Sequence, residues 1–288
     1  MNERSGSTYS PSPERIARET ARRRAARRSI YIAALSTFVF SSILVLSVTS
    51  APGWSRVQTS FFSWDYAVES FPKIMQGLWL NLRVLVICSI VIMIVGLLLA
   101  LARTSKSAVL FPLRALAAGY TDLFRGLPLL LVILLLGLGV PGLRLQGVPN
   151  NVVFFGGLAL ILTYSAYVAE VLRAGIESVH PTQRMAARAL GLNQFQTLRH
   201  VVLPQAVRRV VPPLLNDLVS LQKDSGLISV LGAMDAIKAA QIVTAKSFNF
   251  TPYVVAGVLF VLLTIPLTRI TDAISAKLER ERTIGGGQ

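Results

Sequence analysis

The sequence predicts an all-α membrane protein with about six transmembrane helices, and two observations carry that prediction. Hydrophobic residues make up 53% of the 288 residues and charged residues only 15%, whereas a soluble domain carries about 25% charged residues. The apolar residues also stand in long blocks, near the ~20 residues that a helix needs to cross a bilayer, rather than in the short alternating runs of half-buried strands. Membrane helices account for both features.

A basic tail and one apolar helix are predicted at the N-terminus. Residues 1–29 contain seven arginines between Arg15 and Arg28, set among Ala, Ser and Pro. Because such a composition buries no apolar face, we expect a disordered or surface-lying tail. Residues 30–50 form an apolar run that is longer than the core of a signal peptide, about 7 to 15 residues, so an uncleaved first transmembrane helix is predicted. Residues 51–76 then form an extracytoplasmic segment.

Five further spans are predicted between residues 77 and 270, the membrane core of the protein. The second of them contains Pro128, where we expect a kink. A C-terminal tail, residues 271–288, follows the core. The five predicted spans cover residues 77–102, 116–140, 152–172, 211–234 and 252–267.

Lys and Arg residues are distributed unequally between the two sides of these spans. With the N-terminus inside, 22 of the 29 Lys and Arg residues fall in inner segments and 5 in outer segments. Because inner loops of membrane proteins carry the excess of Lys and Arg, both termini are predicted in the cytoplasm. The inner segments are residues 1–29, 103–125, 173–210 and 269–288.

The charge asymmetry also explains the net charge of +15, together with attraction to anionic membrane lipid. The basic residues do not gather on one domain among aromatic residues, so no nucleic-acid partner is expected. Cys88 is the single cysteine, which excludes a disulfide within the chain and a Cys/His zinc pattern. His180 and His200 are expected to be solvated residues at helix ends. No metal site and no cofactor is therefore predicted.

The longest inner segment, residues 173–210, contains two short helical patterns around Gly191. Pro181 can open the first helix and Gly191 can end it. Asn193 can cap the second helix with Gln196 three residues later, and Pro204 is expected to end it. Small residues on the first helix, and a stripe of Phe195, Leu198 and Val202 on the second, suit docking into a groove on another protein. The alternative is a helical hairpin that packs under its own membrane bundle.

The same stretch resembles the signature loop of binding-protein-dependent ABC importer permeases, which is written EAA, three residues, Gly, nine residues, Ile-x-Leu-Pro. The spacing is kept throughout, with Met185 in place of Glu and Val201 in place of Ile. The loss of Glu removes a charge that could bond the ATPase or cap the loop. The resemblance implies that residues 173–210, here called the coupling loop, dock on a separate ATPase. The residues expected at that contact are Met185, Ala186, Ala187, Gly191, Phe195, Leu203 and Pro204.

Three more segments resemble the polar amino-acid branch of that family, which serves substrates such as histidine, glutamine, glutamate and arginine. They read YTDLFRGLPLL (120–130), AYVAEVLRAGIESV (166–179) and QKDSGLISVLG (222–232), the last with Gly226 where Ser is usual. With the coupling loop they spread over about residues 77–267, so the resemblance implies a five-helix permease core. The tail and the first helix lie outside it as an N-terminal addition.

The resemblance implies a permease subunit of an ATP-driven importer in the prokaryotic cytoplasmic (inner) membrane, forming the translocation pathway for a polar amino acid. Its expected partners are two ABC ATPase subunits, a second permease subunit that is the same or homologous, and an extracytoplasmic substrate-binding protein. The sequence contains no G-x-x-x-x-G-K-[ST] phosphate loop, which agrees with ATP binding on a separate chain. The chain itself is not predicted to be an enzyme.

Polar residues lie at helical spacings on one broad face of the span 211–234. Ionisable groups inside a membrane are costly, so this face is expected to turn inward. It either lines the translocation path or its gate, where Lys223 and Asp224 can meet the carboxylate and amine of an amino acid, or it pairs with neighbouring helices and only fixes the bundle. The sequence leaves both readings open. The residues of this face are Asn216, Asp217, Ser220, Lys223 and Asp224.

Glu170 and Arg173 are spaced to form a structural ion pair on one helix surface. Two rival functions remain to be weighed: a secondary transporter, and a membrane-embedded enzyme that uses Asp217, Lys223 and Asp224 as acid and base. The enzyme lacks a Ser/His/Asp, HExxH or Cys-based constellation, and a secondary transporter needs no loop for ATPase docking. The permease is therefore the favoured prediction.

Overall fold

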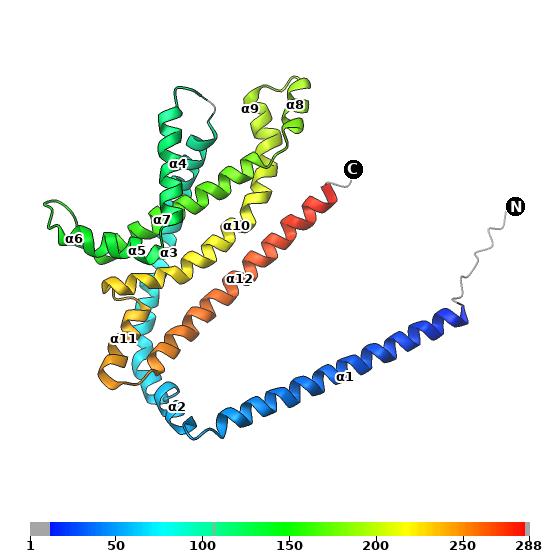
Figure 1. The fold of residues 1–288 in the computed structure, drawn as a ribbon, viewed down its shortest axis with the longest axis vertical. Helices are drawn as coiled ribbons and strands as arrows, with labels where there is room; N and C mark the ends of the chain where they lie inside the picture. The colour runs from blue at the N-terminus through cyan, green and yellow to red at the C-terminus, as the bar shows by residue number, and fades with distance from the viewer. Residues whose placement is uncertain (1–11, 106, 286–288) are drawn as a thin grey trace. The chain divides into compact units, whose positions relative to one another are not determined.

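The computed structural model describes residues 12–105 and 107–285, and every regular element in these ranges is a helix (Figure 1). Four helices are long and apolar enough to cross a membrane, or up to six if each of two bent helix pairs forms one span. The predicted all-α membrane class is thereby confirmed. The chain divides by its internal contacts into two units, residues 1–59 and 60–288, which are described separately.

The first unit contains α1 (Pro13–Thr49), whose apolar part covers Ala26–Thr49. The helix begins well inside the predicted tail, so residues 13–29 are helical rather than disordered, while residues 1–11 lie outside the described part. Ser12 caps the helix by accepting a hydrogen bond from the Arg15 backbone N–H, and Pro13 occupies the first turn. Proline at that position and a sequence rich in Ala and Arg both favour a helix. A short helix, α2 (Trp54–Phe61), follows and runs into the second unit.

The second unit is a bundle in which α7 packs against α3, α4, α5 and α10, while α11 and α12 pack on α3 and on each other. Its main buried cluster joins Val84 and Cys88 of α3, Leu160 and Val168 of α7, and Leu221 of α10. The helices are α3 (Trp64–Thr104), α4 (Phe111–Gly126), α5 (Leu129–Leu134), α6 (Val140–Gly142), α7 (Val152–Glu177), α8 (Pro181–Ala189), α9 (Gln194–Thr197), α10 (Leu203–Asp224), α11 (Ala236–Ser247) and α12 (Thr251–Gly285), with the π-helical turns η1 (Leu135–Gly139) and η2 (Leu198–Val202) and the 3₁₀ helix η3 (Ser225–Leu231).

Several helices extend beyond the predicted spans. Helix α3 begins at Trp64, so residues 64–76 of the predicted extracytoplasmic segment belong to it, and α12 continues to Gly285 through the predicted C-terminal tail. Helix α11 forms between the predicted spans 211–234 and 252–267, where an outer loop is predicted. Hydropathy marks only the part of a helix that crosses the membrane core, whereas the helix itself can continue beyond it, because a helix satisfies its own backbone hydrogen bonds in water as well as in the membrane.

The predicted third span is broken rather than kinked. Its two halves, Phe111–Gly126 and Leu129–Gly142, meet at an angle of 105° (Figure 1). Leu127 has an extended backbone with φ −92° and ψ 136°, and Pro128 follows it before α5 begins. A residue that precedes proline is pushed out of the helical region, so α4 ends there and the chain changes direction.

The prediction that Pro204 ends the second loop helix is wrong. Helix α9 passes through η2 directly into α10, and Pro204 lies in the first turn of α10. A proline ring clashes with the carbonyl four residues before it, here that of His200, and this residue lies in the widened π-helical turn. The local π geometry lets the helix continue through the proline.

The break between η3 and α11 is held by a buried polar network. Asn81 of α3 donates through Nδ2 to the Ser225 carbonyl at 3.0 Å and to Asp235 Oδ2 at 3.2 Å. Its Oδ1 accepts from the Ala236 backbone N–H at 3.2 Å, while Asp235 Oδ1 caps α11 by accepting from the Lys238 N–H at 2.8 Å. Because buried polar groups must be hydrogen-bonded, this network fixes where α11 meets α3.

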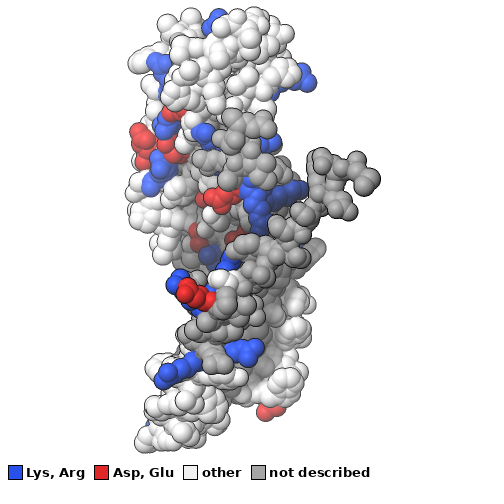
Figure 2. Space-filling view, turned by 90° about the vertical axis from the view of Figure 1, so that its right-hand side faces the viewer, with Lys and Arg blue, Asp and Glu red and all other residues white. Residues whose placement is uncertain are grey.

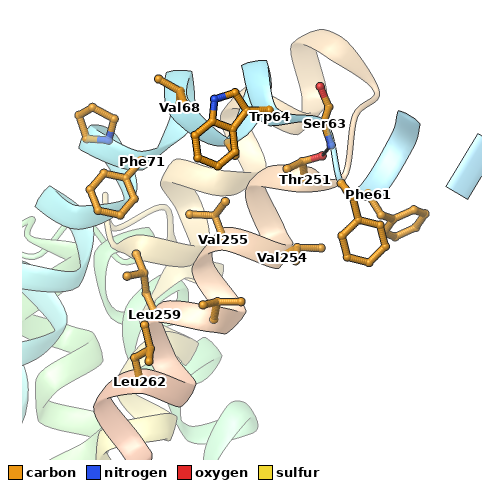
Figure 3. A pocket seen from close by; sticks show the side chains of 14 residues that line it. Phe61, Ser63, Trp64, Val68, Phe71, Thr251, Val254, Val255, Leu259 and Leu262 are labelled. Carbon is orange, nitrogen blue, oxygen red and sulfur yellow. Dashed lines mark hydrogen bonds between the residues drawn. The ribbon is translucent and has the colours of Figure 1, made fainter. Parts of the chain in front are cut away.

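An apolar groove of about 620 Å³ lies between the start of α3 and the start of α12 (Figure 3). The two helix starts are tied by a hydrogen bond from the Ser63 N–H to Thr251 Oγ1 at 3.0 Å. The rings of Phe61 and Phe250 stack at 5.2 Å beside it. Trp64, Phe71 and Leu262 are among the lining side chains, and a surface of this composition offers little to recognise a polar solute.

Charged residues are spread thinly over the surface that Figure 2 shows. Most of its described atoms belong to uncharged residues, and the Lys and Arg side chains are scattered, several of them beside Asp or Glu.

Candidate coupling site and translocation face

The coupling loop forms a helix, a tight turn and a second helix. Helix α8 begins at Pro181, and the chain turns at Gly191, whose φ of +85° lies in the left-handed region. The Gly191 N–H donates to the Arg188 carbonyl at 3.0 Å. Asn193 and Gln196 form the predicted capping box at the start of α9, which confirms that prediction. The left-handed backbone conformation is the reason that the turn needs glycine. Crowding is not the reason, because a Cβ on Gly191 would meet no atom within 4 Å.

Large apolar side chains of the coupling loop point away from the protein. Met185 is 61% exposed, Leu190 84% and Phe195 68%, whereas Ala187 is buried. The predicted stripe of the second helix is divided, since Phe195 and Leu198 are exposed but Val202 is buried. The π-helical turn η2 changes the register between them. The other predicted contact residues, Ala186, Leu203 and Pro204, are exposed. A group of exposed apolar side chains in a loop is a candidate interaction surface.

Glu170 is the centre of an ionic cluster that joins three helices. Its Oε1 lies 2.5 Å from Arg173 Nη2 on the same helix, α7. Its Oε2 lies 2.7 Å from Arg103 Nη1 of α3 and 3.8 Å from Arg125 Nη1 of α4. Arg173 also pairs with Glu177. The structure therefore brings the predicted pair together and adds two arginines, which lie too far away in sequence for helical spacing to reveal them.

The polar residues of the span 211–234 lie within one broad arc of α10, and inside that arc they form two neighbouring stripes with different surroundings. Asp217 and Asp224, seven residues apart, turn into the bundle, where the Tyr164 hydroxyl donates to Asp224 Oδ2 at 2.7 Å. Asn216 and Lys223, also seven residues apart, are exposed, and Ser220 between them is half-buried. A spacing of seven residues returns to the same side of a helix, so each stripe has its own surroundings.

A small cavity of about 50 Å³ lies beside Asp217, and Ser89 of α3 and Tyr164 of α7 also line it. The Oδ2 atom of Asp217 is buried and has no hydrogen-bond partner among the described residues. The cavity is far below the about 300 Å³ of small-molecule pockets. In this conformation an amino acid has no enclosed site beside Asp217.

Gln222 is a buried polar residue of α10 that the sequence reasoning did not include. Its Oε1 accepts a hydrogen bond from Thr264 Oγ1 of α12 at 2.7 Å. Its position in the sequence indicates this role, because a glutamine inside an apolar span needs a hydrogen-bond partner on a neighbouring helix. It ties α10 to α12 on the side away from Tyr164.

The structure is a bundle of membrane-length helices that presents an exposed apolar helix–turn–helix loop. Comparison with known proteins gives the family. The model described as "Binding-protein-dependent transport system inner membrane component" matches residues 92–280, and the chain belongs to this family. It is therefore a multi-pass inner-membrane protein of the ABC transporter permease class.

Named relatives agree with the family. A candidate glutamine transport system permease protein of Rickettsia conorii, GlnP, is 36% identical over 218 residues, covering 74% of this chain and 98% of the relative. The arginine transport system permease protein ArtQ of Bacillus subtilis is 32% identical, covering 74% and 95% of the two chains. The crystal structure of an amino acid ABC transporter with histidines superposes with a TM-score of 0.66 at 30% identity, over 73% of this chain and 96% of that chain.

Proposed function

We propose that the chain is the permease subunit of an ATP-driven importer for polar amino acids and performs no catalysis itself. Two ATPase subunits, a second permease subunit of the same or homologous sequence, and an extracytoplasmic binding protein complete the transporter. The observation that carries the proposal is the exposed apolar surface of the coupling loop, in the signature spacing of the family. The substrate class rests on relatives named for glutamine and arginine transport.

The coupling loop docks on the ATPase in this proposal. Closure of the ATPase pair on ATP moves α8 and α9, and the bundle reorients between openings to the two sides of the membrane. Phe195 acts as an anchor, since an exposed aromatic side chain that becomes buried contributes strongly to an interface. Met185 adds apolar area where the family has a glutamate.

The exposed stripe of α10 faces the translocation path. Asn216, Ser220 and Lys223 supply hydrogen-bonding groups and a positive charge toward the carboxylate of a passing amino acid. A lysine facing lipid in mid-membrane costs about 2.5 to 3.5 kcal/mol, so a water-filled path explains its position better. Asp217 and Asp224 stand one residue further along the helix and supply negative charge behind this stripe.

We expect thiol labelling to test the orientation and the path together. For the orientation, a membrane-impermeant maleimide should label Lys238→Cys from outside and Arg208→Cys only in inverted vesicles. For the path, it should label Asn216→Cys, and bound substrate should slow that labelling. Cys88 is 3% exposed and gives little background. Val261→Cys, on the exposed apolar side of α12, is the lipid-facing control. Inside labelling of Lys238→Cys contradicts the orientation, and equal reactivity of Asn216→Cys and Val261→Cys contradicts the path.

Phe195→Ala is expected to weaken retention of the ATPase during purification without lowering the amount of permease in the membrane. Removal of a central aromatic anchor costs about 2 kcal/mol or more at an interface. Phe248→Ala is the matched control, because Phe248 is even more exposed, at 83%, but ends α11 outside the coupling loop. The stoichiometry of permease and ATPase after detergent purification is the measurement. Wild-type stoichiometry for Phe195→Ala would remove the anchor role.

A further inference from the structure

The carbonyls at the end of α7 accept hydrogen bonds from two arginines of other helices. The Ile176 carbonyl accepts a hydrogen bond from Arg184 Nη2 of α8 at 2.5 Å, and the Ser178 carbonyl accepts one from Arg209 Nη1 of α10. The last four carbonyls of a helix have no partner within it. A cation at that end is also favoured by the helix dipole. Arg184 and Arg209 thus complete the C-terminus of α7.

The end of α7 also packs tightly against α10, which leaves little room for the two helices to move relative to each other. A Cβ on Gly175 would lie 2.0 Å from Val210 Cγ1 and 3.5 Å from the Ala206 carbonyl oxygen, so α7 and α10 are in close contact here. Arg184 is half-buried, and its Nε atom is enclosed. The planar guanidinium group presents its donors in a fixed fork, which holds a single geometry better than a flexible ammonium group does.

The other end of this connection is the Glu170 cluster. Glu170 lies six residues before Ile176 on the same rigid helix, and it bonds Arg103 of α3 and contacts Arg125 of α4. A displacement of α8 that is carried to Ile176 therefore reaches α3 and α4 through α7. Apart from this connection, the described elements that α8 contacts most closely are α9 and η2, both of which belong to the coupling loop.

We propose that Arg184 is the positioning residue that makes α7 follow the coupling loop, so that ATPase closure moves the membrane bundle. The inference rests on the proposed function, because it needs an ATPase docked on α8 and α9. Arg184 itself is not at the exposed docking surface. Its side chain turns to the protein's own α7, whereas Met185 beside it is exposed.

The matched control for Arg184 is Arg269, an exposed arginine of α12 that lies outside the coupling loop. Arg184→Gln removes the charge and the fork, Arg184→Lys keeps a charged donor of nearly the same reach, and Arg269→Gln removes the same charge at a position that takes no part in the proposed docking. All three are measured in the full complex of permease, ATPase and binding protein, reconstituted in proteoliposomes. The readout is the number of substrate molecules imported per ATP hydrolysed, beside the amount of ATPase that co-purifies.

For Arg184→Gln we expect import per ATP to fall roughly tenfold, the factor that corresponds to one lost charge-assisted hydrogen bond. The ATPase should still co-purify and hydrolyse ATP, Arg184→Lys should recover part of the coupling, and Arg269→Gln should equal wild type. A merely structural role would lower the amount of folded complex and leave import per ATP unchanged. Wild-type coupling in Arg184→Gln, or equal loss in Arg269→Gln, overturns the inference alone. A wild-type complex without ATP-driven import overturns the proposed function as well.

Discussion

Gly77→Val is expected to prevent stable assembly of the bundle. A Cβ on Gly77 would lie 2.3 Å from the Asp235 carbonyl carbon and 2.4 Å from the Ala236 nitrogen. These atoms are backbone, and the Asn81 network holds them in place, so they cannot yield as a side chain can. Overpacking typically lowers the free energy of unfolding by about 1 to 3 kcal/mol. Because the contacted backbone cannot move away, we expect a loss of about 3 kcal/mol or more for Gly77→Val. Small residues permit such close helix contacts in membranes.

Gly257→Val is the control for this prediction. Gly257 lies in the transmembrane part of α12, and a Cβ there would meet no atom within 4 Å, so the same β-branched change adds no clash. Thermal unfolding followed by size-exclusion chromatography in detergent measures both variants. A much lower unfolding temperature is expected for Gly77→Val alone. If both variants unfold at the wild-type temperature, the close contact of Gly77 with the start of α11 does not limit the stability of the bundle.

The location of the helices could be predicted from the sequence more accurately than their ends and bends. Hydropathy finds the stretches that must leave water, such as the apolar part of α7, because a span in the membrane core is apolar whether it faces lipid or other helices. It does not reveal that α3 starts at Trp64, since helical hydrogen bonding continues in water without an apolar signal. The sharp bend at Pro128 depends on what surrounds the proline, because a membrane helix can also tolerate that residue as a kink.

The candidate sites show the same division between local and distant information. The capping box at Asn193 and the left-handed turn at Gly191 follow from neighbouring residues, and both could be predicted. The two arginines that reach Glu170 from α3 and α4 depend on tertiary packing. The division of the α10 residues into two stripes arises because α7 covers Asp217 and Asp224 but leaves Lys223 exposed. Spacing along one helix shows which residues align but not which neighbour lies beside them.

Gly191→Val is expected to abolish most transport while the protein inserts and folds normally. A β-branched residue at φ +85° meets a steric penalty of roughly 1 to 2 kcal/mol, which the chain avoids by changing the direction in which α9 leaves the turn. The spans are not affected, because no atom lies within 4 Å of the added Cβ position. Both import and the stimulation of ATP hydrolysis by the binding protein should fall, since in the proposed docking Phe195 and Leu198 would no longer meet the ATPase.

Gly191→Asn is the matched control, because asparagine enters the left-handed region more readily than other non-glycine residues. It adds a side chain of similar size to valine but keeps the backbone turn, so it should retain most of the import. Import and stimulated ATP hydrolysis in proteoliposomes, each normalised to the permease present, measure both variants. Equal loss in the two variants would mean that the side chain itself blocks docking. Wild-type activity in both would mean that the coupling loop only connects two helices and does not dock. Loss in Gly191→Val alone identifies the backbone conformation at residue 191 as the requirement for coupling.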